Sequence, residues 1–219
     1  MRYVTCWLGV GLLLSAGCAE QSQLRRSLAH PYQPTNLTQL ATRLPPNLRR
    51  LAVLPMTAGE KDLSAEADLA TLESILLAEL RKRAVCDVVS ISSEQLRMWS
   101  GRANWRQEDA LPVDLLAKIR EHTGSEGVLF THLSVYRPYP PLAVGWRLSL
   151  IACEQRATLW AADEVFDAGS LQVIKAAQVY ARSQMNQPST ELDGTAVLSS
   201  PRRFGQYSAA AILATLPGH

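Results

Sequence analysis

RRLAVLPM, at residues 49–56, is a short apolar run with two arginines at its start and a proline near its end. A run of this kind is typical of a strand that is buried within a sheet. The segment after it predicts a helix, because its leucines recur at spacings of three and four residues and share one side: Leu69, Leu72, Leu76 and Leu80. VCDVVSI, at residues 85–91, predicts a second strand. Together they predict a βαβ unit with two parallel strands and a right-handed crossover.

Towards the C-terminus, the pattern predicts two further helices and then an antiparallel meander. Pro112 suits the first turn of one of these helices and Gly124 suits its C-cap. The other helix is predicted at residues 92–99. The meander is predicted from strands at residues 127–136, 144–150 and 159–166, and the middle strand alternates as a half-buried strand does. Helices at residues 170–185 and 204–216, separated by a polar loop at 186–200, complete the chain.

These elements predict a single α/β (α+β) domain at residues 48–219. Its mixed sheet would have about five strands, with the βαβ unit followed by the meander and with helices flanking the sheet. No internal repeat is visible in the sequence.

Several segments of this domain resemble one superfamily of bacterial envelope proteins: RRLAVLPM, LAELRKR, GSEGVLFTHLSVY, WRLSLI and ATLWAADEVF. This CsgG-like superfamily contains the curli-secretion lipoproteins and the N-terminal domain of TolB. It also contains lipoproteins that activate penicillin-binding proteins or export exopolysaccharide. The resemblance spans about residues 49–166 and rests on hydrophobic patterns. The turn at Glu154–Arg156 departs from the Asp and Gly that are frequent in the family.

The N-terminus is typical of an exported protein. A short basic start, MRY, precedes the apolar run VTCWLGVGLLL at residues 4–14, which is too short to remain as a membrane-spanning helix. LSAGC, at residues 14–18, is similar to the lipobox of bacterial lipoproteins, with Ser15 in place of the usual Leu. The resemblance implies a lipoprotein signal peptide at residues 1–17 and a covalent lipid on Cys18. The alternative is an ordinary secretory signal that is cut nearby.

Residues 18–47 contain few large apolar side chains and four prolines. Such a composition buries little surface, so this segment is predicted to be a flexible membrane tether. Ala19 follows the cysteine, where enterobacterial lipoproteins kept in the inner membrane have Asp. The prediction is therefore a lipid-anchored protein on the periplasmic face of the outer membrane.

Motifs for catalysis or cofactor binding are absent from the sequence. The four histidines have no metal-ligand spacing to one another or to cysteine, and neither a nucleophile elbow nor a phosphate-binding loop occurs. The net charge of +2 without a long basic run gives no reason to expect a nucleic-acid partner. We therefore expect no metal, no cofactor besides the lipid and no enzymatic activity. Cys86 and Cys153, each within an apolar strand, favour two buried thiols over a disulfide.

Two polar segments are the candidate interfaces. Their aromatic and arginine residues are expected at the surface, and Trp, Tyr and Arg dominate protein–protein contacts. One contains Trp99, Arg102, Trp105 and Arg106, and the other contains Tyr136, Arg137 and Tyr139. The alternative is that these aromatic side chains fold back onto the core.

The resemblance implies a membrane-tethered scaffold or accessory component in envelope assembly or export. The alternatives are an activator that binds a peptidoglycan synthase, and a small envelope hydrolase. Several relatives form rings, so the resemblance also implies a homo-oligomer. A physical reason points the same way, because the outer edge of the last meander strand invites association unless it is covered.

Overall fold

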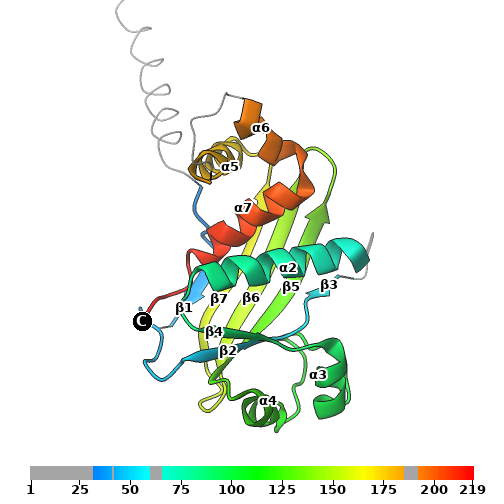
Figure 1. Cartoon of the computed structure of the whole chain (residues 1–219), viewed down its shortest axis with the longest axis vertical. Coiled ribbons are helices and arrows are strands. Elements are labelled where there is room, and N and C mark those ends of the chain that lie inside the picture. The colour runs from blue at the N-terminus through cyan, green and yellow to red at the C-terminus, as the bar shows by residue number, and fades with distance from the viewer. Residues whose placement is uncertain (1–31, 41, 60–65, 185–191) are drawn as a thin grey trace, which may run out of the picture.

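The computed structural model describes residues 32–40, 42–59, 66–184 and 192–219. They form one mixed sheet with helices on both faces, which confirms the predicted fold class (Figure 1). The order of the strands is β1-β7-β6-β5-β2-β4, and a seventh strand, β3, pairs with β5. The strands are β1 (Leu37–Gln39), β2 (Arg50–Val53), β3 (Thr57–Ala58), β4 (Asp87–Ser90), β5 (Gly127–Arg137), β6 (Ala143–Ala152) and β7 (Thr158–Asp167).

The predicted βαβ unit is present as β2, helix α2 (Glu66–Lys82) and β4. β2 lies parallel to β4 on one side and parallel to β5 on the other. β5, β6 and β7 form the predicted antiparallel meander. The two strands that the sequence analysis missed, β1 and β3, are only three and two residues long.

Two helical layers sandwich the sheet. Helices α2 and α7 (Pro201–Leu213) cross one face, where the core includes the fully buried Trp146, Trp160 and Phe204 (Figure 1). Helices α3 (Ser93–Ser100) and α4 (Leu115–Thr123) cover one end of the other face over a smaller apolar cluster. Successive residues of β2 pack alternately into the two apolar clusters: Leu51 and Val53 belong to the first, and Ala52 belongs to the second.

The middle strand of the meander differs from its prediction. β6 was expected to be half-buried, but nine of its ten residues are buried and only Arg147 is exposed. Among the alternating residues on its second face, Gly145 and Ser149 are small and buried. Gly145 is one of them: a Cβ atom there would lie 2.5 Å from the Ser134 hydroxyl, at a bulge in β5. The alternation of large and small residues therefore reflects the available space and not exposure.

The prediction of a polar loop at residues 186–200 is also wrong for the second half of that range. Leu192–Ser199 forms helix α6, which contacts α5 (Leu171–Ser183) and α7. Val197 of this helix is buried in the main core. Leu198, the next residue, also packs against this core. The polar residues elsewhere in the segment concealed these contacts from the sequence analysis. Residues 185–191 lie outside the described part.

The segment expected to be a tether is in large part a piece of the domain. β1 pairs antiparallel with β7, Leu37 lying opposite Ala162 and Gln39 opposite Trp160. Leu44 and Leu48 are buried in the core. The tether prediction is therefore wrong for residues 32–40 and 42–47, because a few well-placed apolar side chains hold a mainly polar, proline-rich segment on the sheet. The predicted signal peptide and Cys18 lie outside the described residues.

The two edges of the sheet differ in how they are protected. β1 covers β7 from Trp160 to Ala162, and the Asp163 N–H donates to the Asn36 carbonyl just beyond. The edge from which we predicted self-association is therefore partly occupied by the chain itself. β4 ends the sheet on the other side.

Candidate interaction sites

The first predicted interface segment folds back onto the domain. Trp105 is 5% exposed and packs in the core cluster beneath α3 and α4, and its indole N–H donates to the Ser100 hydroxyl at 2.8 Å. Arg102 lies over the Trp105 ring at 4.1 Å and pairs with Asp109. Trp99 stacks on His122, and Arg106 donates to the Ala58 carbonyl. Trp105 is therefore a core residue, and Arg106 ties this loop to β3.

In the second predicted interface segment, one aromatic side chain is largely exposed to solvent. Tyr139 is 77% exposed in the turn between β5 and β6. Tyr136 is half-buried against the main core, and its pKa is raised to about 12 by burial and by the nearby Asp68. Arg137 pairs with Asp167 at 2.9 Å. This ion pair joins the turn to the end of β7, so Arg137 holds the loop in shape.

The fold does not bring the two segments together. Arg106 lies beside His132, near the middle of β5, whereas Tyr139 lies beyond the end of the same strand. At about 3.3 Å per residue, roughly 20 Å of strand separates the two levels. The aromatic and arginine residues do not therefore form one continuous surface.

A polar crevice that the sequence analysis missed lies on the sheet face beside β3. Arg147 of β6 pairs with Asp163 of β7 at 2.7 Å and with Glu108 at 3.6 Å. His132 is 9% exposed, and its Nδ1 lies 2.8 Å from the Thr57 hydroxyl. Burial, together with the positive charges of Arg106 and Arg147, lowers the pKa of His132. The signal available in the sequence was Arg147, the one charged residue in the run at 143–152.

The floor of this crevice contains a polar atom without a protein partner. The hydroxyl of Ser149 is buried and makes no hydrogen bond to any described residue. The crevice has a volume of only about 10 Å³. That is close to the space of one water molecule, which would satisfy Ser149.

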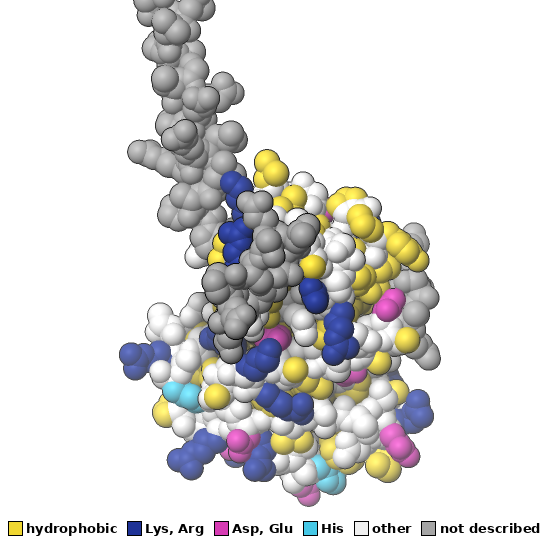
Figure 2. All heavy atoms as spheres, turned by 45° about the horizontal axis from the view of Figure 1, so that its top comes forward, with side chains coloured by type: hydrophobic (Ala, Val, Ile, Leu, Met, Phe, Trp, Pro, Cys, Tyr) yellow, Lys and Arg dark blue, Asp and Glu magenta, His cyan; other side chains and the backbone are white. Residues whose placement is uncertain are grey.

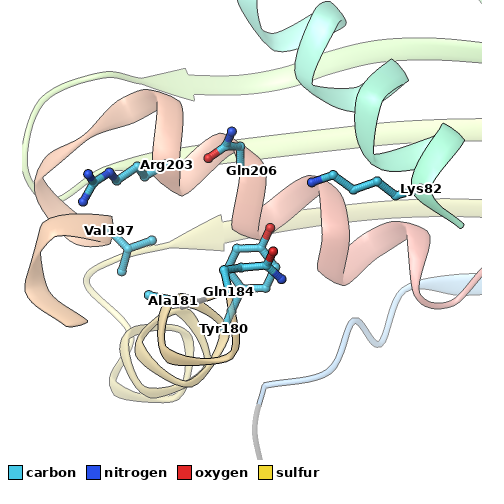
Figure 3. A pocket seen from close by; sticks show the side chains of 7 residues that line it. All are labelled: Lys82, Tyr180, Ala181, Gln184, Val197, Arg203 and Gln206. Atoms are coloured by element: carbon cyan, nitrogen blue, oxygen red, sulfur yellow. The ribbon is translucent and has the colours of Figure 1, made fainter. Parts of the chain in front are cut away.

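A larger pocket of about 300 Å³ lies between helices α2, α5, α6 and α7 (Figure 3). Lys82 reaches into it from α2 toward Gln206, while Arg203 and Val197 lie at the opposite end (Figure 3). The Lys82 ammonium is 2.5 Å from the buried Glu79 carboxylate. Burial, with a smaller effect of Glu79, raises the pKa of Tyr180 on the pocket wall to about 12. The wall thus offers hydrogen-bond donors and acceptors for a small polar molecule.

Neither cysteine is positioned for chemistry or for a disulfide. Cys86 and Cys153 are free thiols, as predicted, and the first is half-buried while the second is buried. Cys86 directly precedes β4 and Cys153 directly follows β6, and β5 and β2 lie between these two strands in the sheet. Burial raises the pKa of each thiol to about 11, so both stay protonated near neutral pH. No group of three His, Cys, Asp or Glu side chains that could hold a metal ion occurs among the described residues.

The surface carries charge of both signs. On the face in Figure 2, Lys and Arg side chains are more numerous than Asp and Glu and are spread out. Hydrophobic side chains gather on the upper part of the same face (Figure 2). Within the residues that the structure describes, no helix has both the length and the apolar character to cross a membrane.

Comparison with known proteins gives structural likenesses only. No family model and no curated protein matches this sequence. Solved structures similar to the chain include bacterial lipoproteins. The PelC dodecamer from Paraburkholderia phytofirmans is 18% identical, with a TM-score of 0.39, over 76% of this chain and 94% of that chain. Lipoprotein GNA1162 from Neisseria meningitidis is 16% identical, with a TM-score of 0.37, over 68% and 90%. The LpoB C-terminal domain from Escherichia coli is 14% identical, with a TM-score of 0.36, over 66% and 93%. Likeness at these values assigns neither a family nor a function to the chain.

Proposed function

We propose that this protein is a lipid-anchored envelope lipoprotein that acts without catalysis, as a scaffold or accessory component in envelope assembly or export. The lipid on Cys18 holds it to a membrane, and the α/β domain binds a partner. Its place is the periplasmic face of the outer membrane, because Ala19 and not Asp follows the cysteine.

The observation that carries this proposal is LSAGC at residues 14–18, directly after a basic start and an apolar run. Acylation of that cysteine with a diacylglycerol and an amide-linked chain would anchor the protein firmly, since a single chain binds membranes only marginally.

The fold adds a limit on the length of the tether. The Tyr32 hydroxyl donates to the Glu164 carboxylate at 2.6 Å, and the Thr35 N–H donates to the same carboxylate at 2.6 Å. The domain therefore begins no later than Tyr32, 14 positions after Cys18. At about 3.3 Å per residue, the connection can reach at most about 45 Å. The lipid would thus hold the β7 side of the sheet closer to the membrane than a tether ending at Asn47 would.

The polar crevice offers no substrate site to the hydrolase alternative. Its charged groups are engaged in the Arg147–Asp163 and Arg147–Glu108 ion pairs. Its volume of about 10 Å³ has no room for a substrate. The alternative of a small hydrolase would need another site for its substrate.

Replacement of Cys18 tests the proposal. In cells that make lipoproteins, Cys18→Ser should abolish incorporation of labelled palmitate and move the protein from the membrane to the soluble fraction, or leave its signal peptide uncut. Cys6→Ser is the matched control, because Cys6 lies in the apolar run of the signal peptide. It should be labelled and anchored as the unmodified chain is. Membrane association and mass that do not change in Cys18→Ser would overturn the proposal.

A further inference from the structure

β4 presents an open backbone edge. The Asp87 N–H donates to the Arg49 carbonyl at 2.8 Å, and the Ile91 N–H donates to the Val53 carbonyl at 2.9 Å, both toward β2. Backbone groups of successive residues in a strand point to opposite sides, so those of Val88 and Ser90 point outward. No described residue pairs with this side of β4. Ser90 is exposed and Val88 is half-exposed, as expected at a free edge.

A hollow lies at each end of β4, between the strand and helix α2. One, of about 570 Å³, is lined by Arg81, Cys86 and Val88, and the other, of about 350 Å³, by Ser74, Leu77 and Ser90. Their α2 residues lie at spacings of three and four and thus share one side of the helix. Leu77, which lines the second hollow, and Val88, which lines the first, are both half-buried against the core. We call the open edge of β4, with the two hollows that it shares with α2, the β4–α2 groove.

The ends of this groove differ in charge. Two arginines and one carboxylate line the hollow at the start of β4: Arg49, Arg81 and Asp87. The Asp87 carboxylate also lies 4.0 Å from Arg50, so arginine is in excess at this end. Glu73 lines the hollow at the other end. A strand that runs antiparallel to β4 has its C-terminal end at the basic hollow and its N-terminal end near Glu73. The charges favour that direction for a segment with a carboxylate at its C-terminal end.

We propose that the β4–α2 groove binds an extended segment of a partner protein, which joins the sheet antiparallel to β4 with a carboxylate in the basic hollow. Main-chain hydrogen bonds to Val88 and Ser90 supply affinity, while apolar side chains at alternate positions of the segment contact Leu77 and Val88. This inference rests on the proposed scaffold function and specifies the kind of segment that the partner protein would contribute. The groove is five strand spacings, about 24 Å, from the β1 edge beside which the tether enters, so it stays accessible on an anchored protein.

A random heptapeptide library with free carboxyl ends tests the groove with the full chain in detergent micelles. Selection should enrich peptides that have apolar residues at alternate positions and a carboxylate at the C-terminal end. Fluorescence anisotropy of the best enriched peptide should then show at least tenfold weaker binding to Ser90→Pro. Proline removes the outward N–H of Ser90 and none of the bonds to β2, and edge strands tolerate proline at such positions.

Two matched controls separate this effect from general damage. Leu171→Pro also introduces a proline at an exposed position, but Leu171 is the first residue of α5, where proline is favoured, and it lines neither hollow. It should bind the peptide as the unmodified chain does. Arg81→Gln should weaken binding of the free-carboxylate peptide at least threefold more than that of its C-terminal amide. Arg202→Gln, at an exposed position of α7, should not.

Three results would each overturn the inference: enrichment of no peptide, equal binding of the selected peptide by Ser90→Pro and by the unmodified chain, or enrichment of acidic residues at the opposite end. A dimer in light scattering that Ser90→Pro dissolves would assign the edge to a second copy and would also overturn it. Because none of these measurements depends on acylation, the groove can fail while the lipoprotein proposal stands, and the reverse.

Discussion

His132 has surroundings that its position in the sequence did not indicate. Sequence analysis predicted only that this position belongs to the strand at residues 127–136. The fold adds that Arg106 of a distant loop and Arg147 of the neighbouring strand both lie near it. Burial and these two cations disfavour a third positive charge, so the imidazole stays neutral in the folded protein near pH 7.

The lowered pKa of His132 predicts how stability depends on pH. In the unfolded chain the imidazole has a pKa of about 6.5. Below that pH the unfolded chain binds a proton that the neutral His132 of the folded protein does not. The contribution of His132 to the free energy of unfolding is therefore fully present above pH 6.5 and is lost as the pH falls through the pKa of the folded state. The urea midpoint should therefore fall between pH 7.5 and pH 5, and less so in His132→Gln.

The comparison with a second histidine makes this test specific. His122 is exposed at the end of α4 and does not line the crevice, so His122→Gln removes an imidazole without changing the surroundings of His132. If His132→Gln and the unmodified chain lose stability in parallel as the pH falls, the titration of His132 does not contribute.

Among the elements, α3 shows how local sequence sets a boundary. The Ser92 hydroxyl accepts from the Gln95 N–H at 3.1 Å, and the Ser92 N–H donates to the Gln95 side chain at 2.9 Å. This reciprocal pair satisfies two backbone donors at the start of the helix. Gly101 ends it with a φ of 79°, a conformation that costs glycine little. The expected helix at residues 92–99 differs from the observed Ser93–Ser100 by one residue at each end.

Removal of this cap should cost about 1 kcal/mol of the free energy of unfolding. We expect Ser92→Ala to lower the urea midpoint accordingly, with an unchanged dependence on denaturant. Ser93→Ala is the control one residue further on, where the side chain makes no capping bond, and it should change stability by less than about 0.5 kcal/mol. Equal losses in the two variants would show that the capping box contributes nothing.

At the scale of the whole molecule, the N-terminal segment decides where the domain begins. Glu164 receives hydrogen bonds from Tyr32 and from two backbone N–H groups, of Thr35 and Asn36. Burial acts to raise the pKa of Glu164, but these hydrogen bonds hold it below its ordinary value. The segment is thus fastened by a charged group and by the buried Leu44, in addition to the β1–β7 pairing.

A fragment of residues 48–219 should therefore be less stable than one of residues 32–219. Loss of the buried Leu44 side chain alone predicts at least about 2 kcal/mol, measured as the difference in the free energy of unfolding in urea. A Leu44→Ala variant of the longer fragment should show part of that loss. Equal stability of the two fragments would restore the original domain boundary near residue 48.

The sequence by itself determined the elements that repeat a local pattern. The leucines of α2 and the apolar runs of β2, β5 and β7 predict their own structures, because periodicity over one element decides which side is buried. Adjacent residues also predict an export signal and lipid attachment at Cys18, which stay predictions. The candidate interface was predicted less well, since neither the burial of Trp105 nor the isolation of Tyr139 follows from residue type.

Only the tertiary structure decided which strand carries the open edge and which polar groups meet. Tyr32 and Glu164 are 132 positions apart, and the partners of Arg147 come from β7 and from the loop after α3. Such contacts form because the sheet order places β7 beside β1 and leaves β4 at the end. Sheet order depends on the packing of all strands and helices together, and no pattern within a single element contains it.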